Sequence, residues 1–358
     1  MPGVRHRAWL HLPLDSSKPD NQVSDAVSDT RHGSFDRVLA VGSRRVSDLG
    51  ATVSSLPRAA LLHAADSEQL QHLVQGHGRR LGAGRFVAGE TLDECVRVLR
   101  GLNEGGLYAN TTLLGEAIPD EAGAAAVTDE YQRIAERLAA ERLRANIALK
   151  LTHLGLSFDE ETAYENVARL VARAGELGTS VRLDMEQSEY VDGTLRTYER
   201  LRAAGLESVG TVLQAYLYRT ADDLERLLPS RPNLRIVKGA YLEPASIAYP
   251  EKRDVDRAYV RLVRRGLREG AYIAVATHDE QIIRFVQRFA AREDIPRDRF
   301  EFQMLYGVRP ALQRTIAAEG YKVLVAAPYG PDWYPYFMRR LAERPANVTF
   351  FLRNLVRR

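Results

Sequence analysis

The sequence predicts an α/β fold in which eight parallel strands alternate with helices, as in a (βα)₈ barrel. Eight short, mostly apolar runs lie between residues 107 and 327, and stretches with helical spacing separate them. Such an alternation is typical of a barrel or of a doubly wound sheet. No G-x-G-x-x-G motif follows the first run, which disfavours the dinucleotide-binding sheet. The 358 residues can form one large domain of this kind.

Each apolar run is short enough for a parallel strand that is buried on both faces. We expect strands at 107–112, 146–151, 180–185, 210–216, 234–239, 272–277, 299–304 and 322–327. The amphipathic spacing predicts helices at 127–144, 160–177, 192–204, 220–228, 254–269, 279–292 and 309–319. Four helices are followed by a glycine suited to a left-handed cap: Gly178, Gly205, Gly270 and Gly320. Thr220 and Asp223 form an expected N-cap pair.

The ends of the chain and its composition restrict its class. Residues 1–56 are rich in polar residues and glycine, and we expect an extension that is poorly ordered or accessory to the barrel of residues 57–358. The net charge of +3 comes from interspersed signs, which argues against a nucleic-acid partner. The single cysteine, Cys95, excludes an intramolecular disulfide and lies where a helix would bury it as a small apolar residue. Without a long apolar run or a clear secretory signal, a cytoplasmic protein is expected.

Polar residues at the ends of the predicted strands are candidate site residues, because a barrel carries its active site there. Lys150 lies in the apolar run IALKLT, either as a solvated rim residue or paired with Asp184 on the next strand. Gln214 is either a satisfied core amide or a contact to a heterocyclic ligand. His278 suits a helix N-cap or a metal ligand, but no second ligand stands at metal-binding spacing, so no metal is expected.

The segment WYPYFMRRLAERP combines aromatic and charged residues near the C-terminus. Arg339 and Arg340 precede Glu343 by four and three residues, so a helix brings all three to one face. This spacing suits either a surface salt-bridge ladder or a clamp for a zwitterion. In the clamp, the guanidinium groups hold a carboxylate while the glutamate supports an amine. The spacing alone leaves both interpretations open.

Several motifs in order resemble the bacterial monofunctional proline dehydrogenases, a family of FAD-dependent proline oxidases. They are RFVAGET, LKLT, RLDME, VLQAY, RIVKGAY, ATHDE, EFQMLYGV and DWYPYFMRRLAERPAN, and the match covers residues from about 57 to the end. The resemblance implies a distorted (βα)₈ barrel with an N-terminal helical extension and a last helix over the barrel mouth. It also implies oxidation of L-proline to Δ¹-pyrroline-5-carboxylate by hydride transfer to FAD. Electrons would pass to a membrane quinone, with the protein peripheral at the inner face of the membrane and a separate pyrroline-5-carboxylate dehydrogenase as partner.

The resemblance also assigns roles to individual positions. The substrate carboxylate would meet Lys150, Arg339 and Arg340, with Asp184 and Glu343 supporting this clamp. The proline ring would pack against Ala240, Leu305 and Tyr336. The expected flavin contacts are Asp184, Gln214, Arg235, Val237, Lys238, Gly239, Ala240, Tyr241, Thr277 and His278.

One position departs from the family pattern. Ala326 stands where the family usually carries a tyrosine that packs near the substrate, so a wider pocket with weaker discrimination against hydroxyproline is expected. Tyr329, Tyr334 or Tyr336 could fill part of the space. Two other functions remain open at this point. Lys238 could form a Schiff base in an aldolase-type barrel, or the barrel could bind a flavin without turnover.

Overall fold

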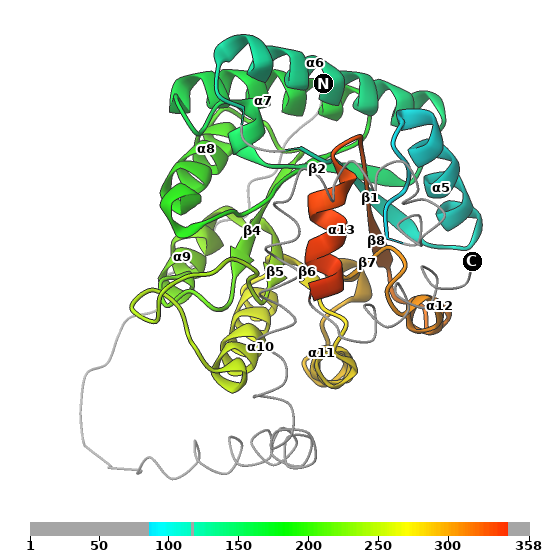
Figure 1. The fold of residues 1–358 in the computed structure, drawn as a ribbon. Coiled ribbons are helices and arrows are strands. Elements are labelled where there is room, and N and C mark those ends of the chain that lie inside the picture. The colour runs from blue at the N-terminus through cyan, green and yellow to red at the C-terminus, as the bar shows by residue number, and fades with distance from the viewer. Residues whose placement is uncertain (1–85, 116–117, 343–358) are drawn as a thin grey trace, which may run out of the picture. The chain divides into compact units, whose positions relative to one another are not determined.

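The computed structural model describes residues 86–115 and 118–342, with side chains up to residue 337. Eight parallel strands form a closed barrel in which each strand pairs with the next and the last pairs with the first (Figure 1). The strands are β1 (Tyr108–Leu113), β2 (Ala145–Leu149), β3 (Val181–Leu183), β4 (Val209–Gln214), β5 (Asn233–Val237), β6 (Tyr272–Ala276), β7 (Phe300–Leu305) and β8 (Val323–Tyr329). The predicted barrel is confirmed, and the doubly wound sheet is excluded.

Helices surround this barrel (Figure 1). They are α5 (Leu92–Glu104), α6 (Glu121–Ala140), α7 (Glu160–Glu176), α8 (Val191–Ala203), α9 (Thr220–Leu227), α10 (Lys252–Arg268), α11 (Glu280–Arg292), α12 (Pro310–Ala318) and α13 (Trp333–Ala342). The predicted ranges agree closely except for α6, which begins earlier than expected. Asp120 caps this helix by accepting a hydrogen bond from the amide of Gly123, and the alanine-rich start hides the apolar period.

The predicted glycine caps are confirmed, and the predicted N-cap pair is wrong. The four glycines expected after helices have positive φ values of 70°, 77°, 77° and 84°: Gly178, Gly205, Gly270 and Gly320. Thr220, in contrast, is the first residue of α9, and its hydroxyl donates to the Gln214 carbonyl at 2.6 Å. Asp223 accepts from Arg219 instead of capping the helix. Thr220 thus lies one residue too late to cap α9, and its hydroxyl instead binds the carbonyl group at the end of β4.

The last helix follows the end of β8 after a short turn. Trp333 and Phe337 of α13 are buried, and Trp333 Nε1 donates to Glu90 Oε1 at 3.2 Å. The rings of Phe86 and Phe337 lie 6.3 Å apart, centroid to centroid. Figure 1 draws α13 in front of the strands, as expected for a helix over the barrel mouth. The extension predicted for residues 1–56 lies outside the described residues.

Charged side chains fill part of the barrel interior, where branched apolar residues are more usual. Arg182 of β3 is buried and donates to the Asn233 carbonyl on β5 at 2.9 Å. Because β4 separates these two strands, the side chain must cross the interior. It passes over Gly210 of β4, where a Cβ atom would stand 2.5 Å from Arg182 Nη1 and 2.8 Å from the Asn233 oxygen. The buried arginine therefore needs glycine at this position.

None of the described helices is long and apolar enough to cross a membrane.

Replacing Gly210 with alanine should destabilise the barrel. The added methyl group meets a guanidinium fixed by hydrogen bonds and a backbone oxygen, and overpacking of this kind costs about 1 to 3 kcal/mol. Urea unfolding of Gly210→Ala and wild type measures the difference. Gly101→Ala is the matched control, because nothing lies within 4 Å of its added methyl group on α5. That control should be neutral or up to about 1 kcal/mol more stable. Equal stability of Gly210→Ala and wild type would contradict the packing argument.

Candidate active site

Most of the predicted site residues lie together at the carboxyl ends of the strands. Lys150 and Asp184 follow directly after β2 and β3, whereas Gln214, Val237 and Leu305 are the last residues of β4, β5 and β7. Side chains alternate between the two faces of a strand, so positions two apart share a face. Arg235 and Gln303 contact each other across the barrel. Val237 and Leu305 stand two positions later and therefore share their inward face. The structure thus brings these predicted residues together at one end of the barrel.

An ion pair between Asp184 and Arg235 joins β3 and β5, two strands that are separated by β4. Arg235 Nη2 donates to Asp184 Oδ1, and the guanidinium is buried. The sequence did not predict this contact with Arg235, and the pairing expected between Asp184 and Lys150 stays a prediction. Lys150 follows the neighbouring strand β2, whereas Arg235 reaches Asp184 from β5 across the interior. Burial, followed by the charge of Arg182, lowers the pKa of Arg235 to about 9, and the charge of Glu301 opposes this shift.

Lys150 lies next to two buried titratable residues. Its side chain is half-buried, which argues against a fully solvated rim lysine. Burial raises the pKa of Glu186, and the charge of Lys150 is among the effects that oppose this. Burial, together with the charge of Lys150, lowers the pKa of His153 to about 4. The imidazole is therefore neutral at physiological pH, and its Nε2 atom is buried without a hydrogen-bond partner among the described residues.

The side chain of Gln214 is fixed on one side only. Its Nε2 donates to the backbone oxygen of Glu186 at 2.7 Å. The Glu186 carboxylate in turn accepts from the amide and the hydroxyl of Thr152, at 3.2 and 2.8 Å. Gln214 Oε1 is buried, and no described protein group donates to it. Buried amide oxygens are nearly always hydrogen-bonded, so the alternative of a fully satisfied core amide is not what the structure shows.

The segment after β5 brings four predicted residues to the barrel mouth. Lys238 forms ion pairs with Asp256 on α10 and with Asp279, at 2.5 and 3.5 Å. Gly239 has φ +112°, and a Cβ atom there would lie 2.2 Å from the Tyr216 ring. Only glycine fits this backbone and this contact. Ala240 is exposed and Tyr241 is half-buried.

The residues after β6 are used differently from either alternative that the sequence left open. His278 Nε2 accepts from the backbone amide of Leu305 at 2.9 Å, and the N-cap of α11 is Asp279. Thr277 is buried, and its hydroxyl accepts from the Asp279 amide at 3.1 Å. Within the described ranges, no group of three or more potential metal ligands occurs. Through its hydrogen bond with the Leu305 amide, His278 fixes the end of β7 beside the barrel mouth.

Ala326 lies beside the predicted wall of the substrate pocket. It pairs in register with Leu305 on β7 and is partly exposed. Tyr329 is three residues later on the same strand and therefore points to the opposite face. Its hydroxyl lies 3.4 Å from Glu130 Oε1 on α6, outside the barrel. Tyr329 thus cannot fill the space beside Ala326, whereas Tyr336 on α13 is half-buried.

The predicted zwitterion clamp falls at the end of the described chain. Residues 339 and 340 belong to the backbone of α13, as the helical spacing required. The side chains of Arg339 and Arg340, and the whole of Glu343, lie outside the described residues. The clamp itself remains a prediction.

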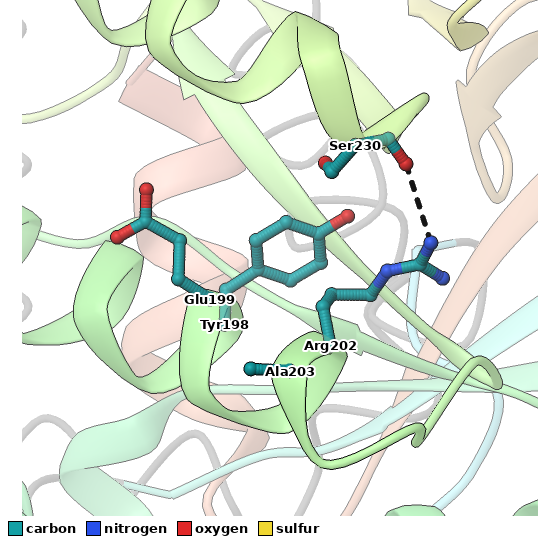
Figure 2. Close-up of a pocket in the computed structure, with 5 residues that line it drawn as sticks. All are labelled: Tyr198, Glu199, Arg202, Ala203 and Ser230. Carbon is teal, nitrogen blue, oxygen red and sulfur yellow. Dashed lines mark hydrogen bonds between the residues drawn. The ribbon is translucent and has the colours of Figure 1, made fainter.

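A pocket of about 400 Å³ lies away from these residues (Figure 2). Tyr198, Glu199, Arg202 and Ala203 on α8 line it together with Ser230, whose carbonyl accepts from Arg202 at 3.3 Å. These residues precede β4 and β5, so the pocket is at the amino ends of those strands. It is at the opposite end from Gln214 and Val237.

Sequence reasoning missed the partners of the predicted residues. Asp256 holds Lys238, and Gln303 accepts from Arg235 at 3.2 Å. Glu301 accepts from Gln303 at 2.6 Å. A carboxylate on the buried face of an amphipathic helix could have indicated Asp256. The alternation in EFQM, with polar residues at every second position of a buried strand, could have indicated Glu301 and Gln303.

Comparison with known proteins identifies relatives of the whole barrel. The family model described as proline dehydrogenase matches residues 95–353. Proline dehydrogenase 1 of Bacillus subtilis is 41% identical over 301 residues, which cover 84% of this chain and 99% of that protein. Proline dehydrogenase of Deinococcus radiodurans is 43% identical over 309 residues, covering 85% and 99%. Proline utilization A (PutA) of Bdellovibrio bacteriovorus, in a crystal structure of the form inactivated by N-propargylglycine, shares the fold with a TM-score of 0.70. It is 23% identical, over 80% of this chain and 36% of that one.

The buried His153 should make the fold sensitive to acid. Its pKa is lowered from 6.5 to about 4 in the folded protein, so below pH 6.5 the unfolded chain binds a proton that the folded protein does not. Stability is then lost as the pH falls from 6.5 towards 4, by about 2 to 3 kcal/mol. His153→Asn removes this titration. Urea unfolding at about pH 7 and about pH 4.5 should show a smaller loss in the variant. An equal loss in both proteins would refute the assignment.

Proposed function

This chain belongs to the proline dehydrogenase family, and we propose that it oxidises L-proline to Δ¹-pyrroline-5-carboxylate with FAD as the hydride acceptor. The observation that carries the proposal is the buried Arg235, held by Asp184 beside the partnerless oxygen of Gln214. Gln214 is the last residue of β4, and Arg235 lies on β5 and reaches Asp184 just after the end of β3. Active sites of barrel enzymes lie at this end.

The residues at the mouth fit a flavin. An isoalloxazine ring offers an N–H donor and several acceptors at its edge. Gln214 Oε1 and Arg235 Nε are a buried acceptor and a buried donor without protein partners among the described residues, which is the complementary set. Gly239 lets the backbone pass close to the Tyr216 ring, with which any side chain at this position would clash. In our proposal, Asp184, Val237, Lys238, Ala240, Tyr241, Thr277 and His278 complete the FAD contacts.

When bound, FAD supplies the hydride acceptor. The protein supplies orientation and charge. Arg235 stays protonated near neutral pH, because its pKa of about 9 lies above that range. A fixed cation at this place favours the negative charge that a flavin gains on reduction. The ion pairs of Lys238 with Asp256 and Asp279 do not suit a Schiff base, which needs an uncharged amine.

The substrate would be held through its two charged groups. We assign its carboxylate to Lys150, Arg339 and Arg340, with Glu343 as support for the clamp. Leu305, Ala240 and Tyr336 would wall the ring. Holding both charges orients the donor carbon, and the burial of Trp333 and Phe337 on α13 supports a helix that shields the site from water.

The electron acceptor and the following enzyme are further parts of the proposal. We propose a membrane quinone as the acceptor, which the protein reaches as a cytoplasmic protein peripheral to the inner face of the membrane. A separate pyrroline-5-carboxylate dehydrogenase would consume the product. PutA of Escherichia coli, 27% identical over 24% of its own length, is named a bifunctional protein, which supports a second activity in association with this one.

The reaction can be tested on the purified protein. It should be yellow with a flavin absorption band, and anaerobic L-proline should bleach that band. Arg235→Met should lower the rate of bleaching by about 100-fold or more, because a fixed cation is lost from the transition state. Arg284→Met is the matched control, since Arg284 pairs with Glu319 on the outer layer and should not affect bleaching. A flavoprotein that proline does not bleach would refute the function.

The preference between proline and hydroxyproline tests the departure at Ala326. Ala326→Tyr should narrow the pocket beside Leu305, its partner in register. The ratio of kcat/KM for L-proline to that for hydroxyproline should rise about ten-fold, because filling an apolar site is worth about 1 to 3 kcal/mol. Steady-state kinetics on both substrates give the ratio. If the ratio does not move, Ala326 does not line the substrate pocket.

A further inference from the structure

A chain of hydrogen bonds runs through the barrel interior from Arg235 through Gln303 to Glu301. Arg235 Nη1 donates to Gln303 Oε1 at 3.2 Å, and Gln303 Nε2 donates to Glu301 Oε1 at 2.6 Å. All three side chains are buried. Arg235 is on β5 and Gln303 is on β7, with β6 between them. The first of these bonds therefore crosses the interior and ties two strands that are not neighbours.

Glu301, the last residue of this hydrogen-bond chain, is held near the amino ends of the strands. Glu301 Oε2 accepts from the hydroxyl of Tyr272 and from Lys322 Nζ, both at 2.8 Å. The side chain of Glu301 is 2% exposed and that of Lys322 is 39% exposed. The buried carboxylate thus has a cationic partner that reaches solvent just before β8. Tyr272 and Lys322 therefore hold the Glu301 carboxylate without a direct contact from Arg235.

The chemistry of the two neighbours fixes the orientation of Gln303. A guanidinium only donates hydrogen bonds, and an ionised carboxylate only accepts them. The amide oxygen must therefore face Arg235, and the amide nitrogen must face Glu301. With the reverse orientation, both hydrogen bonds would be lost inside the barrel, where such losses are costly. Gln303 is accordingly a rigid spacer between the two charges.

We propose that Gln303 is a positioning residue for the flavin-facing cation, and that it transmits the fixed position of Glu301 to the guanidinium of Arg235. Asp184 holds the same guanidinium from the mouth, so Arg235 is clamped from both sides. Gln303 acts only through Arg235 and is not a catalytic residue. This inference rests on the proposed function, because it takes Arg235 to face the flavin.

The reduction potential of the bound flavin reports on this clamp. Gln303→Met keeps the length and the burial of the side chain but removes both hydrogen bonds. The reduced flavin should become about ten-fold less favoured, which is about 30 mV more negative for a two-electron couple. The rate of flavin reduction by saturating proline should fall about ten-fold, with little change in KM, since no substrate contact is altered. Redox-dye titration with dithionite gives the potential without any need for proline.

The chain contains a matched control on the outside of the barrel. Gln287 on α11 accepts from Arg284 Nη1 at 3.0 Å and donates to Glu319 Oε2 at 2.8 Å. This is the same order of arginine, glutamine and glutamate. Gln287→Met removes the same two kinds of hydrogen bond and should leave both the potential and the rate unchanged. A general loss of stability would affect both variants alike.

A second variant guards against misfolding of the first. Gln303→Asn keeps the amide but is one methylene too short to bridge Arg235 and Glu301, so its potential should shift in the same direction. If wild type is bleached by proline and both Gln303 variants keep its potential and rate, the inference is wrong and the function stands. If proline fails to bleach wild type but Gln303→Met still shifts the potential, the function fails and the clamp stands. A protein that binds no flavin overturns both.

Discussion

The buried guanidinium of Arg235 is the constraint on which the arrangement of the site depends. A positive charge inside a barrel is stable only if other groups satisfy its donors and balance its charge. Asp184 does so at the mouth, and Gln303 does so in the interior, with the charge of Glu301 behind it. The inward positions of three strands are therefore committed to polar residues. Polar side chains thus replace, around Arg235, the apolar layers that usually fill the interior of such barrels.

This polar interior also governs the strands beside it. Arg182 also points into the barrel interior, and its charge lowers the pKa of Arg235, so the two arginines must be kept apart. The carbonyl groups of Thr211 and Asn233 hold Arg182 at 3.0 and 2.9 Å. Gly210 leaves space for it. Carbonyl groups of β4 and β5, with the side chain of Asn233, thus fix Arg182. Asp184, which follows β3, and Gln303 of β7 fix Arg235.

The sequence predicts the barrel well and the partners within it poorly. Short apolar runs and glycine caps are local signals, so the strands and most helices lie where they were expected. The environment of Cys95 was also predictable, because its helix buries it beside Thr111 and its pKa rises to about 12. The pairing of Asp184 was not predictable in this way. It depends on which inward side chains meet across the barrel, and adjacency of strands suggested only Lys150 as a partner, without Arg235.

Strand β7 shows how electrostatics and substrate shape can be separated within one element. Gln303 and Leu305 are two residues apart and share the inward face. Gln303 contacts Arg235 in the interior, whereas Leu305 pairs in register with Ala326 at the mouth. In the proposed function, a change at Ala326 therefore alters the wall of the substrate pocket without changing the groups that hold Arg235. An alanine at position 326 therefore leaves the contacts of Arg235 intact, because the side chains that hold Arg235 come from other positions and other strands.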